Sequence, residues 1–578
     1  MKLIWKYLMK YKKWFLLDFI SVFGFALVEL GIPTIISDMI DHGIETQDTT
    51  YLYSRFVLMA FISVIGVSGV VLLGYCCSKI STNITRDIRN DVFEHAQAFS
   101  AAEMEKFGVS SMITRTNNDA YQIMLFLNVI LKSALLTPVM MCVSVMLILK
   151  ISLELSYVVL ATIPVVILGV IIVAKVSEPL SENQQKSIDH INQILRENIT
   201  GIRVIRSFNK QEYEKKRFSN ENDFYRDQSA KLFKLMSCTE PSFFFLMNIA
   251  TVIVYYLSCT LLNTNAITLG NVVAFVEYLF HVMMSVLIFC MVFMMYPRAN
   301  VSAKRILEVL DTKPSIVNDE NSIQLESIQT LSFKDVTFSY PNGEEAVLKN
   351  IDFVCQKGQK IAVIGSTGSG KSTLINLVPR FYDVTSGSIC VDGVDIRDVK
   401  QEDLRSRIGY VPQKGMLLSG DIESNLLYSK KDANAKDIES ALSISQSTEF
   451  VSKKPEGIHC EISQGGTNVS GGQRQRLSIA RAIVRKPEIY IFDDSFSALD
   501  FKTDAKLREA LAKSCKETKS TVLLVAQRIS SILHADQIIV LDEGKMVGKG
   551  THAELMESCD VYQQIASSQL TKEELANV

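Results

Sequence analysis

The chain has 578 residues and a mass of 64.7 kDa, which is long enough for several domains, each with its own core. Its formal net charge of −2 gives no support for a nucleic-acid partner. Apolar residues make up 48% of the chain and form long runs in its first half. In the second half, apolar and polar residues are mixed as in a soluble domain. The composition therefore favours a multi-domain membrane protein.

The first half is predicted to be an all-α domain that crosses the membrane. Residues 1–14 interleave five lysines with apolar residues and lack a cleavage site, so we interpret them as a basic helix on the inner membrane surface. Six apolar stretches near the length needed to cross a bilayer follow within residues 15–311. They cover about 15–37, 55–78, 124–149, 153–176, 242–262 and 272–297.

Charges in the connections predict the orientation of the spans. The loop after the first span carries four acidic residues between Asp38 and Asp48, whereas the second and fourth connections are rich in Lys and Arg. Because positive charge is retained on the cytoplasmic side, the N-terminus, both long connections and the second half are placed in the cytoplasm. Both connections are far longer than a hairpin needs, so the spans are predicted to continue as helices beyond the lipid bilayer.

Some polar and sulfur-containing residues inside the spans allow more than one interpretation. Glu277 and His281 are four residues apart and share one helix face, either as a polar spot in a transport pathway or as an interhelical or outer-interface pair. The methionines between Met283 and Met295 either line a pliable cavity or simply pack, and we favour packing. The eleven cysteines, Cys142, Cys259 and Cys290 among them, are interpreted as small buried hydrophobes rather than a disulfide or zinc framework.

The second half is α/β in texture and contains a phosphate-binding loop. A short apolar run, residues 361–364, precedes the loop, and a helix-like segment that includes Thr373 follows it. The glycines allow bare backbone N–H groups to surround phosphates, and the helix N-terminus adds a positive dipole end. Lys371 would pair with the β and γ phosphates of a nucleotide, and the Ser372 hydroxyl would hold Mg²⁺. The loop is Gly365, Ser366, Thr367, Gly368, Ser369, Gly370, Lys371 and Ser372.

Five further segments carry recognisable patterns. Val469-Ser470-Gly471-Gly472-Gln473 places a serine and bare glycine amides at a helix start, where they can donate to a phosphate. Ile489 to Asp494 is an apolar strand that ends in two acids, of which Asp493 would orient Mg²⁺ through water. The remaining three are Tyr340 at the end of a strand, Gln413 after Tyr410-Val411-Pro412, and Ser497-Ala498-Leu499-Asp500.

In their order and spacing these motifs resemble those of the half-size exporters of the ATP-binding-cassette (ABC) family, over nearly the whole chain. The resemblance implies that ATP and Mg²⁺ are cofactors, that Tyr340 stacks on adenine, and that Gln413 senses Mg²⁺ and the γ-phosphate. It also implies short coupling helices at the tips of the cytoplasmic loops, near Arg115–Asp119 and Glu197–Phe208. The domains are then a six-span region at 15–311, a linker at 312–330, an ATPase domain at 331–570 and a tail at 571–578.

Two residues depart from the family pattern. Asp494 stands where the family has a glutamate that polarises water, and Gln527 stands where it has a histidine that holds the γ-phosphate. A displacement on the order of 1 Å in a positioning group can cost roughly a hundredfold in rate. Glutamine can donate a hydrogen bond but cannot become cationic. We therefore predict that Asp494 and Gln527 make this chain's own catalytic site slow, although both could also be harmless variants.

These departures favour a heterodimer over a homodimer. The family closes two ATPase domains around two nucleotides, so the intact Ser470–Gln473 signature would complete a competent site on a second half-transporter. The predicted function is ATP-driven export of drugs or other small amphipathic compounds, as in bacterial heterodimeric multidrug exporters. The alternatives are a lipid, peptide or heme-type exporter, and a membrane sensor that binds ATP without transport. The six spans exclude a soluble DNA-repair ATPase, and the fused domains disfavour an importer.

Overall fold

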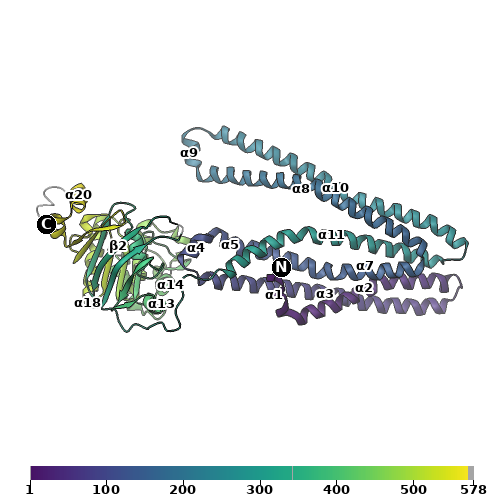
Figure 1. The fold of residues 1–578 in the computed structure, drawn as a ribbon, viewed down its shortest axis with the longest axis horizontal. Coiled ribbons are helices and arrows are strands. Elements are labelled where there is room, and N and C mark those ends of the chain that lie inside the picture. The colour runs from purple at the N-terminus through teal and green to yellow at the C-terminus, as the bar shows by residue number, and fades with distance from the viewer. Residues whose placement is uncertain (1, 342, 570–578) are drawn as a thin grey trace. The chain divides into compact units, whose positions relative to one another are not determined.

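The computed structural model describes residues 2–341 and 343–569, apart from the side chain of Met294. The chain divides into two compact units (Figure 1). The first contains the chain up to Gln97 together with Val109–Thr312, and the second contains Ala98–Gly108 together with the chain from Lys313 on. The predicted tail at 571–578 lies outside the described residues.

The first unit is entirely helical among the described residues and contains six helical runs that are long and apolar enough to cross a membrane. This confirms the predicted six-span region. The helices are α1 (Lys2–Leu8), η1 (Met9–Tyr11), α2 (Lys12–Met39), η2 (Ile40–Ile44), α3 (Thr49–Gln97), α5 (Val109–Thr114), η3 (Arg115–Asp119), α6 (Ala120–Val129), η4 (Ile130–Ala134), α7 (Leu135–Ile151), α8 (Leu153–Thr200), α9 (Ile202–Ser207), α10 (Gln211–Asn263) and α11 (Leu269–Asp311).

Several of these helices extend well beyond the thickness of a bilayer. Helices α3, α8 and α10 contain 49, 48 and 53 residues. At a rise of about 1.5 Å per residue they are roughly 70–80 Å long, against about 30 Å for the hydrocarbon core. The α8–α10 pair separates from the other helices of the unit toward the end that carries α9 (Figure 1). The unit therefore has a membrane part and long helical extensions.

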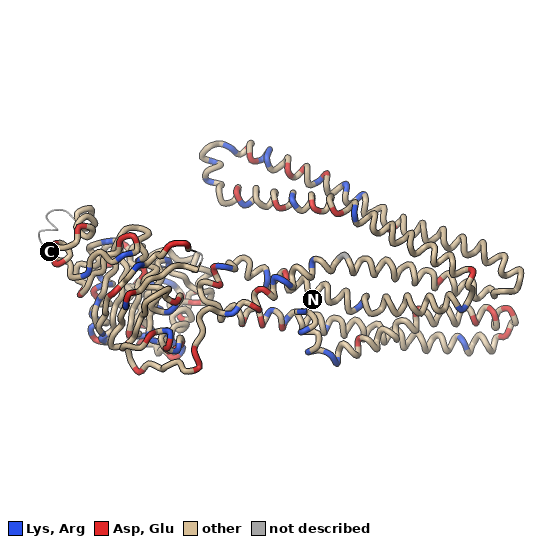
Figure 2. The backbone as a smooth tube through the Cα atoms, viewed as in Figure 1, with Lys and Arg blue, Asp and Glu red and all other residues tan. Residues whose placement is uncertain are grey.

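The distribution of side chains around the helices fits a bilayer environment. Along α3, the apolar residues Val57, Phe61, Val64 and Val71 recur at helical spacing, and each has more than half of its surface exposed. The middle parts of the spans carry few charged residues, and an acidic group marks the end of the unit near η2 (Figure 2). Lipid would cover such an apolar stripe.

One prediction for the first unit needs correction, and the structure adds contacts to another. Cys142 and Cys259 were expected to be buried, but both are exposed, because lipid rather than protein can provide the apolar surroundings of a span. In the N-terminal segment, Leu3, Ile4, Tyr7 and Leu8 are buried, and the Tyr7 hydroxyl donates a hydrogen bond to Asp91 of α3. The apolar face of this predicted surface helix therefore packs against the protein itself.

The second unit is built on a ten-stranded sheet with the order β5-β4-β1-β2-β12-β11-β3-β10-β9-β6. Strands β11, β3, β10, β9 and β6 are parallel neighbours, whereas β1 pairs antiparallel with β2 and β4. The strands are β1 (Thr330–Phe338), β2 (Leu348–Gln356), β3 (Lys360–Gly365), β4 (Ser386–Val391), β5 (Val394–Asp395), β6 (Ile408–Val411), β9 (Ile489–Asp493), β10 (Thr521–Val525), β11 (Gln537–Asp542) and β12 (Lys545–Gly550), with β7 (Gly420–Asp421) and β8 (Glu461–Ile462) in a separate pair.

Alternate residues of the parallel strands point into two separate cores. Ala362 and Ile364 of β3 belong to one hydrophobic cluster, and Ile361 and Val363 belong to the other. Successive side chains of a strand face opposite sides of a sheet, so helices cover both faces. The helices are α4 (Ala101–Phe107), α12 (Lys371–Leu377), α13 (Gln401–Ser406), α14 (Ile422–Leu427), α15 (Ala435–Ile444), α16 (Thr448–Ser452), η5 (Gly457–His459), η6 (Gln464–Gly466), α17 (Gly471–Val484), α18 (Phe501–Thr518), η7 (Ile529–Ser531), α19 (His552–Ser558) and α20 (Asp560–Gln569).

The first cytoplasmic loop contributes α4 to the second unit, which corrects the predicted position of its coupling helix. Ser100 caps α4 in a capping box with Glu103, and Ala101 and Ala102 pack against the core of the second unit. Arg115–Asp119 instead forms η3 in the first unit, where the Ser302 hydroxyl of α11 donates to Asp119 at 2.8 Å. The tip of the second loop is α9, within the predicted segment.

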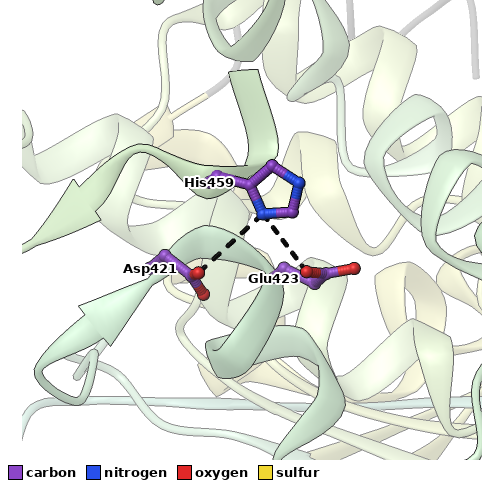
Figure 3. A group of neighbouring side chains, drawn as sticks. All are labelled: Asp421, Glu423 and His459. Atoms are coloured by element: carbon purple, nitrogen blue, oxygen red, sulfur yellow. Dashed lines mark ion pairs between the residues drawn. The ribbon is translucent and has the colours of Figure 1, made fainter. Parts of the chain in front are cut away.

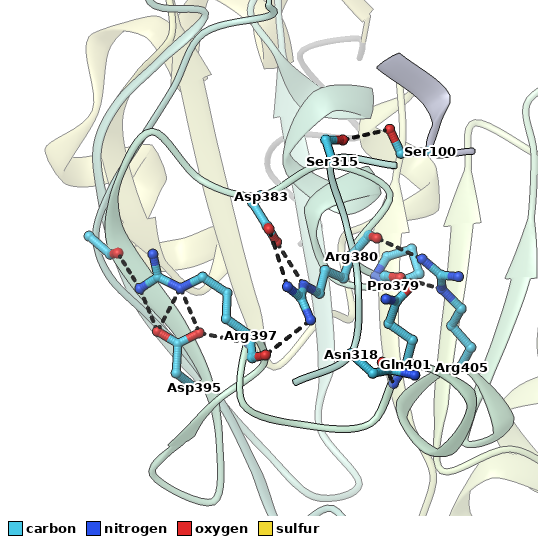
Figure 4. Close-up of polar contacts among 11 residues, drawn as sticks. Ser100, Ser315, Asn318, Pro379, Arg380, Asp383, Asp395, Arg397, Gln401 and Arg405 are labelled. Atoms are coloured by element: carbon cyan, nitrogen blue, oxygen red, sulfur yellow. Dashed lines mark hydrogen bonds and ion pairs between the residues drawn. The ribbon is translucent and has the colours of Figure 1, made fainter. Parts of the chain in front are cut away.

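The segment that joins the two domains is held to the second unit by hydrogen bonds. The Ser315 hydroxyl lies 3.0 Å from the Ser100 hydroxyl (Figure 4). The Ser315 N–H donates to Glu103 at 3.2 Å. Asn318 accepts from the Gln401 N–H at 2.9 Å and donates to Glu402 at 2.9 Å. The segment predicted as a linker therefore ties α4 to α13.

Candidate functional site

The parallel strands bring the phosphate-binding loop and three further predicted site residues to one edge of the sheet. The phosphate-binding loop follows β3, Asp494 follows β9, and Gln527 lies two residues beyond β10. Gln413 lies two residues beyond β6, whose Val411 is paired with Phe492 of β9. Because carboxyl ends of parallel strands meet at the same edge, residues from distant parts of the chain come together there.

Glycines let the phosphate-binding loop pass close to neighbouring backbone. A Cβ on Gly365 would lie 2.1 Å from the Leu541 carbonyl oxygen. Gly370 has a φ of +94°, and a Cβ there would lie 2.7 Å from the Leu348 side chain. Larger residues would displace the loop at both positions, so these glycines are needed for its curved path.

The Lys371 side chain lies over the loop. Its ammonium donates to the carbonyl oxygens of Gly365 at 2.9 Å and Ser366 at 2.6 Å. Burial lowers the pKa of Lys371, while the charges of Asp494 and Asp493 oppose that shift. The oxygens of a phosphate would accept hydrogen bonds from the Lys371 ammonium and would add negative charge beside it, as the two carboxylates already do. The residues present therefore fit a nucleotide.

Two of the three residues predicted to bind Mg²⁺, Ser372 and Asp493, are neighbours, and the third, Gln413, contacts Asp494. The Ser372 hydroxyl donates to Oδ1 of Asp493 at 2.8 Å, and Asp493 is 6% exposed. Burial raises the pKa of Asp493. A hydroxyl and a carboxylate at this distance provide the hard oxygen ligands that Mg²⁺ prefers, and the cation would offset the cost of burying the carboxylate.

Asp494 is held by both predicted catalytic amides. Oδ2 of Asp494 accepts from Nε2 of Gln527 at 2.7 Å and from Nε2 of Gln413 at 3.4 Å. Asp494 has a φ of +44°, which is uncommon outside glycine, and its side chain is nearly buried. Burial raises its pKa. The side chain that would polarise water is therefore already engaged by the side chain that replaces histidine.

Tyr340 lies beside the helix that follows the phosphate-binding loop. Its hydroxyl is 3.0 Å from the Thr373 hydroxyl, and its ring packs edge-on against Phe338 and Tyr382. The Tyr382 hydroxyl donates to Glu105 of α4 at 2.8 Å. Glu105 and Tyr382 were not identified from the sequence. The Ser100-x-x-Glu103 capping box, two residues before Glu105, does signal a helix start.

Ser470–Gln473 forms a separate feature at the start of α17. The Ser470 hydroxyl accepts from the Gln473 N–H at 3.2 Å, and the Gln473 side chain accepts from the Ser470 N–H at 3.1 Å. Ser470 and Gly471 are exposed. In the described part of the chain, the hydrogen bonds of the Ser470 side chain are made within this segment and not with the chain's own phosphate-binding loop.

Two further groups of polar residues have contacts of their own: the Glu277 and His281 pair of the sixth span, and a cluster on the second unit. His281 is 3.6 Å from Glu29 of α2, an interhelical contact, while Glu277 is exposed. Asp421, Glu423 and His459 form a group of potential metal ligands on β7, α14 and η5 (Figure 3). His459 lies 3.3 Å from Glu423, and Asp421 also caps α14, so surface ion pairing and capping account for the group.

Comparisons with known proteins agree over the full chain. A family model described as "ABC transporter transmembrane region" matches residues 15–286, and one described as "ABC transporter" matches residues 348–497. An "Uncharacterized ABC transporter ATP-binding protein YfiB" of Bacillus subtilis is 34% identical, with 94% of each chain covered. An "ATP-dependent lipid A-core flippase" of Vibrio vulnificus is 30% identical, with 98% of this chain and 96% of that protein covered.

A solved structure shares the fold at lower sequence identity. The structure of a bacterial Atm1-family ABC exporter with ATP bound matches with a TM-score of 0.78 and 22% identity, and covers 97% of this chain and 99% of that one. This likeness confirms the predicted fold, a six-span helical region followed by an α/β domain.

Proposed function

The chain belongs to the ABC transporter family as a half-size exporter with fused membrane and ATPase domains, and we propose that it is one half of a heterodimeric exporter. In this proposal its own phosphate-binding loop holds ATP with slow hydrolysis. Its Ser470–Gln473 signature completes a faster site on a different half-exporter. The cargo is a drug or another small amphipathic compound.

The observation that carries the proposal is the 2.7 Å hydrogen bond from Gln527 to Asp494. The Gln527 amide is neutral and is already engaged by this carboxylate, so it does not offer the γ-phosphate the cationic contact that the family assigns to histidine. Both amides that contact Asp494 donate to the same oxygen. In a homodimer both sites would contain this arrangement, so a partner with the full pair of catalytic residues is needed for rapid turnover.

Two exposed features of the chain suit a protein partner. The second unit has an open groove of about 480 Å³, lined in part by Met416, Leu418 and Tyr428. All three side chains are exposed, and Tyr428 is 71% exposed. The exposed apolar residues Val204 and Phe208, on and beside α9, have the size and chemistry that such a groove would accept from a partner. We propose that reciprocal docking of this kind joins the two half-exporters.

A lipid is the second candidate cargo, since a relative that matches 98% of this chain is named as a lipid A-core flippase. The pair should be reconstituted in proteoliposomes and supplied with a fluorescent amphipathic cation or with a labelled glycolipid. ATP-dependent movement of the first supports drug export, and movement of the second supports lipid export. Binding of ATP without movement of either would favour a membrane sensor.

The heterodimer is tested by purifying the tagged chain from its native membranes in mild detergent. We expect a second half-exporter in equal amount, with glutamate at the position of Asp494 and histidine at the position of Gln527. Recovery of this chain alone, as a homodimer with rapid ATP turnover, would contradict the proposal.

A further inference from the structure

The last described helix of the chain is firmly anchored in the second unit. In α20, Tyr562 and Ala566 are fully buried, and the Tyr562 hydroxyl lies 2.7 Å from Nδ1 of His552 in α19. Burial of these side chains fixes the helix against the core. Gln569, at the end of α20, is therefore presented from a rigid element.

The Gln569 amide bridges the loop that carries Gln527. Its Nε2 donates to the Gln527 carbonyl oxygen at 2.8 Å, and its Oε1 accepts from the Ile529 N–H at 2.8 Å. One orientation of the amide satisfies both contacts, because one partner is an acceptor and the other is a donor. Ile529 is itself fully buried. The two hydrogen bonds of the Gln569 amide therefore connect α20 to the backbone on both sides of Arg528.

We propose that Gln569 is a positioning residue that keeps the Gln527 amide on Asp494 and thereby stabilises bound nucleotide. The inference rests on the proposed slow ATP site. Asp494 lies close enough to Lys371 for its charge to act on that ammonium. If the Gln527 loop shifted, the Asp494 carboxylate would lose its 2.7 Å donor and could turn toward the nucleotide phosphates, which repel it.

The test measures release of a photoreactive, non-hydrolysable ATP analogue from this chain in the assembled exporter. Gln569→Ala should release the analogue about fivefold to tenfold faster, the equivalent of one net hydrogen bond. Gln569→Glu can still accept from Ile529 but cannot donate to the Gln527 carbonyl, so it should also release faster. Gln564→Ala, at an exposed position on the same helix, is the matched control and should not change release.

A double variant separates positioning from a general structural role. In a Gln527→Ala background, Gln569→Ala should cause no further acceleration, because the effect passes through the Gln527 side chain. Unchanged release in Gln569→Ala, or equal acceleration with and without the Gln527 side chain, would overturn the inference. Because the analogue is not hydrolysed, neither result depends on whether this chain's site turns over slowly.

Discussion

At the scale of single residues, the functions of the site can be performed by only a few residue types. A phosphate-binding loop needs glycines, a lysine and a hydroxyl at fixed positions, so the sequence alone could locate residues 365–372. The contact between Gln527 and Asp494 could not be read in the same way. It depends on β9 and β10 being parallel neighbours with Val525 beside Asp493, a pairing between segments far apart in the chain.

Lys371 is the residue whose removal should affect nucleotide binding most directly. Lys371→Ala should weaken ATP binding by this chain about tenfold to a hundredfold, because hydrogen bonds to charged groups are worth about 1.5–3 kcal/mol. Photolabelling of this chain with a reactive ATP analogue at graded concentrations measures the change. Lys334→Ala, at an exposed lysine of β1, is the control, and equal labelling of both variants would show that Lys371 does not contact phosphate.

At the scale of elements, the sequence predicted the long helices and the single strands beside the motifs better than it predicted contacts between elements. Apolar runs and charge asymmetry specify a span, because the bilayer acts on every residue of the segment. The coupling helix of the first loop was misplaced at Arg115–Asp119, since a seven-residue helix has no periodic signal. The sequence signals of this helix are a capping residue and two alanines. They could be interpreted only once the structure showed that the alanines pack on the second unit.

The contact between α4 and the ATPase domain should depend on the Tyr382 hydroxyl. Tyr382→Phe removes the 2.8 Å bond to Glu105 but keeps the ring that packs against Tyr340, so ATP binding should remain within about twofold of the parent. Hydrogen exchange of a peptide that covers α4 should become about fivefold faster, as expected for one lost hydrogen bond.

The matched control for this variant is Tyr428→Phe, because that side chain is 71% exposed. It should leave the exchange of α4 unchanged. Unaltered exchange in Tyr382→Phe would mean that the packing of Ala101 and Ala102, rather than the hydrogen bond, holds α4 in place.

At the scale of the whole molecule, two distant connections lie at the same end of the first unit. Asp41 of η2 accepts from the Gly270 N–H at 2.8 Å and from the Thr268 hydroxyl at 2.5 Å. The first and last hairpins between spans therefore share one side of the membrane. The Lys- and Arg-rich connections are retained in the cytoplasm, which places these two hairpins on the outer side.

Single cysteines test this orientation in a background without native cysteines. Cysteines at Thr46 and Thr264, both exposed and near those hairpins, should react with an impermeant thiol reagent in intact cells. A cysteine at Ser110, which is exposed next to α4, should react only after the cells are opened. Labelling of Ser110 but not of Thr46 in intact cells would reverse the topology.

The division of labour between two ATP sites makes a prediction for the assembled exporter. If Asp494 serves a slow site, Asp494→Ala should lower total ATPase only modestly, by less than about twofold, because little flux passes there. Ser470→Arg should reduce it by a hundredfold or more, since donors to a transferring phosphoryl group are commonly worth several kcal/mol. Turnover is measured on pairs that contain equal amounts of both folded proteins.

Ser470→Ala extends that comparison, because it removes the hydroxyl without adding bulk or charge. The hydroxyl caps α17 through the Gln473 N–H, so part of any loss would come from a weakened helix start rather than from the partner's nucleotide. Ser447→Ala, which removes a buried hydroxyl elsewhere in the domain, reports on general destabilisation. An equally complete loss of turnover in Asp494→Ala and Ser470→Arg would show that this chain's own site hydrolyses ATP rapidly, and the asymmetric heterodimer would lose its main support.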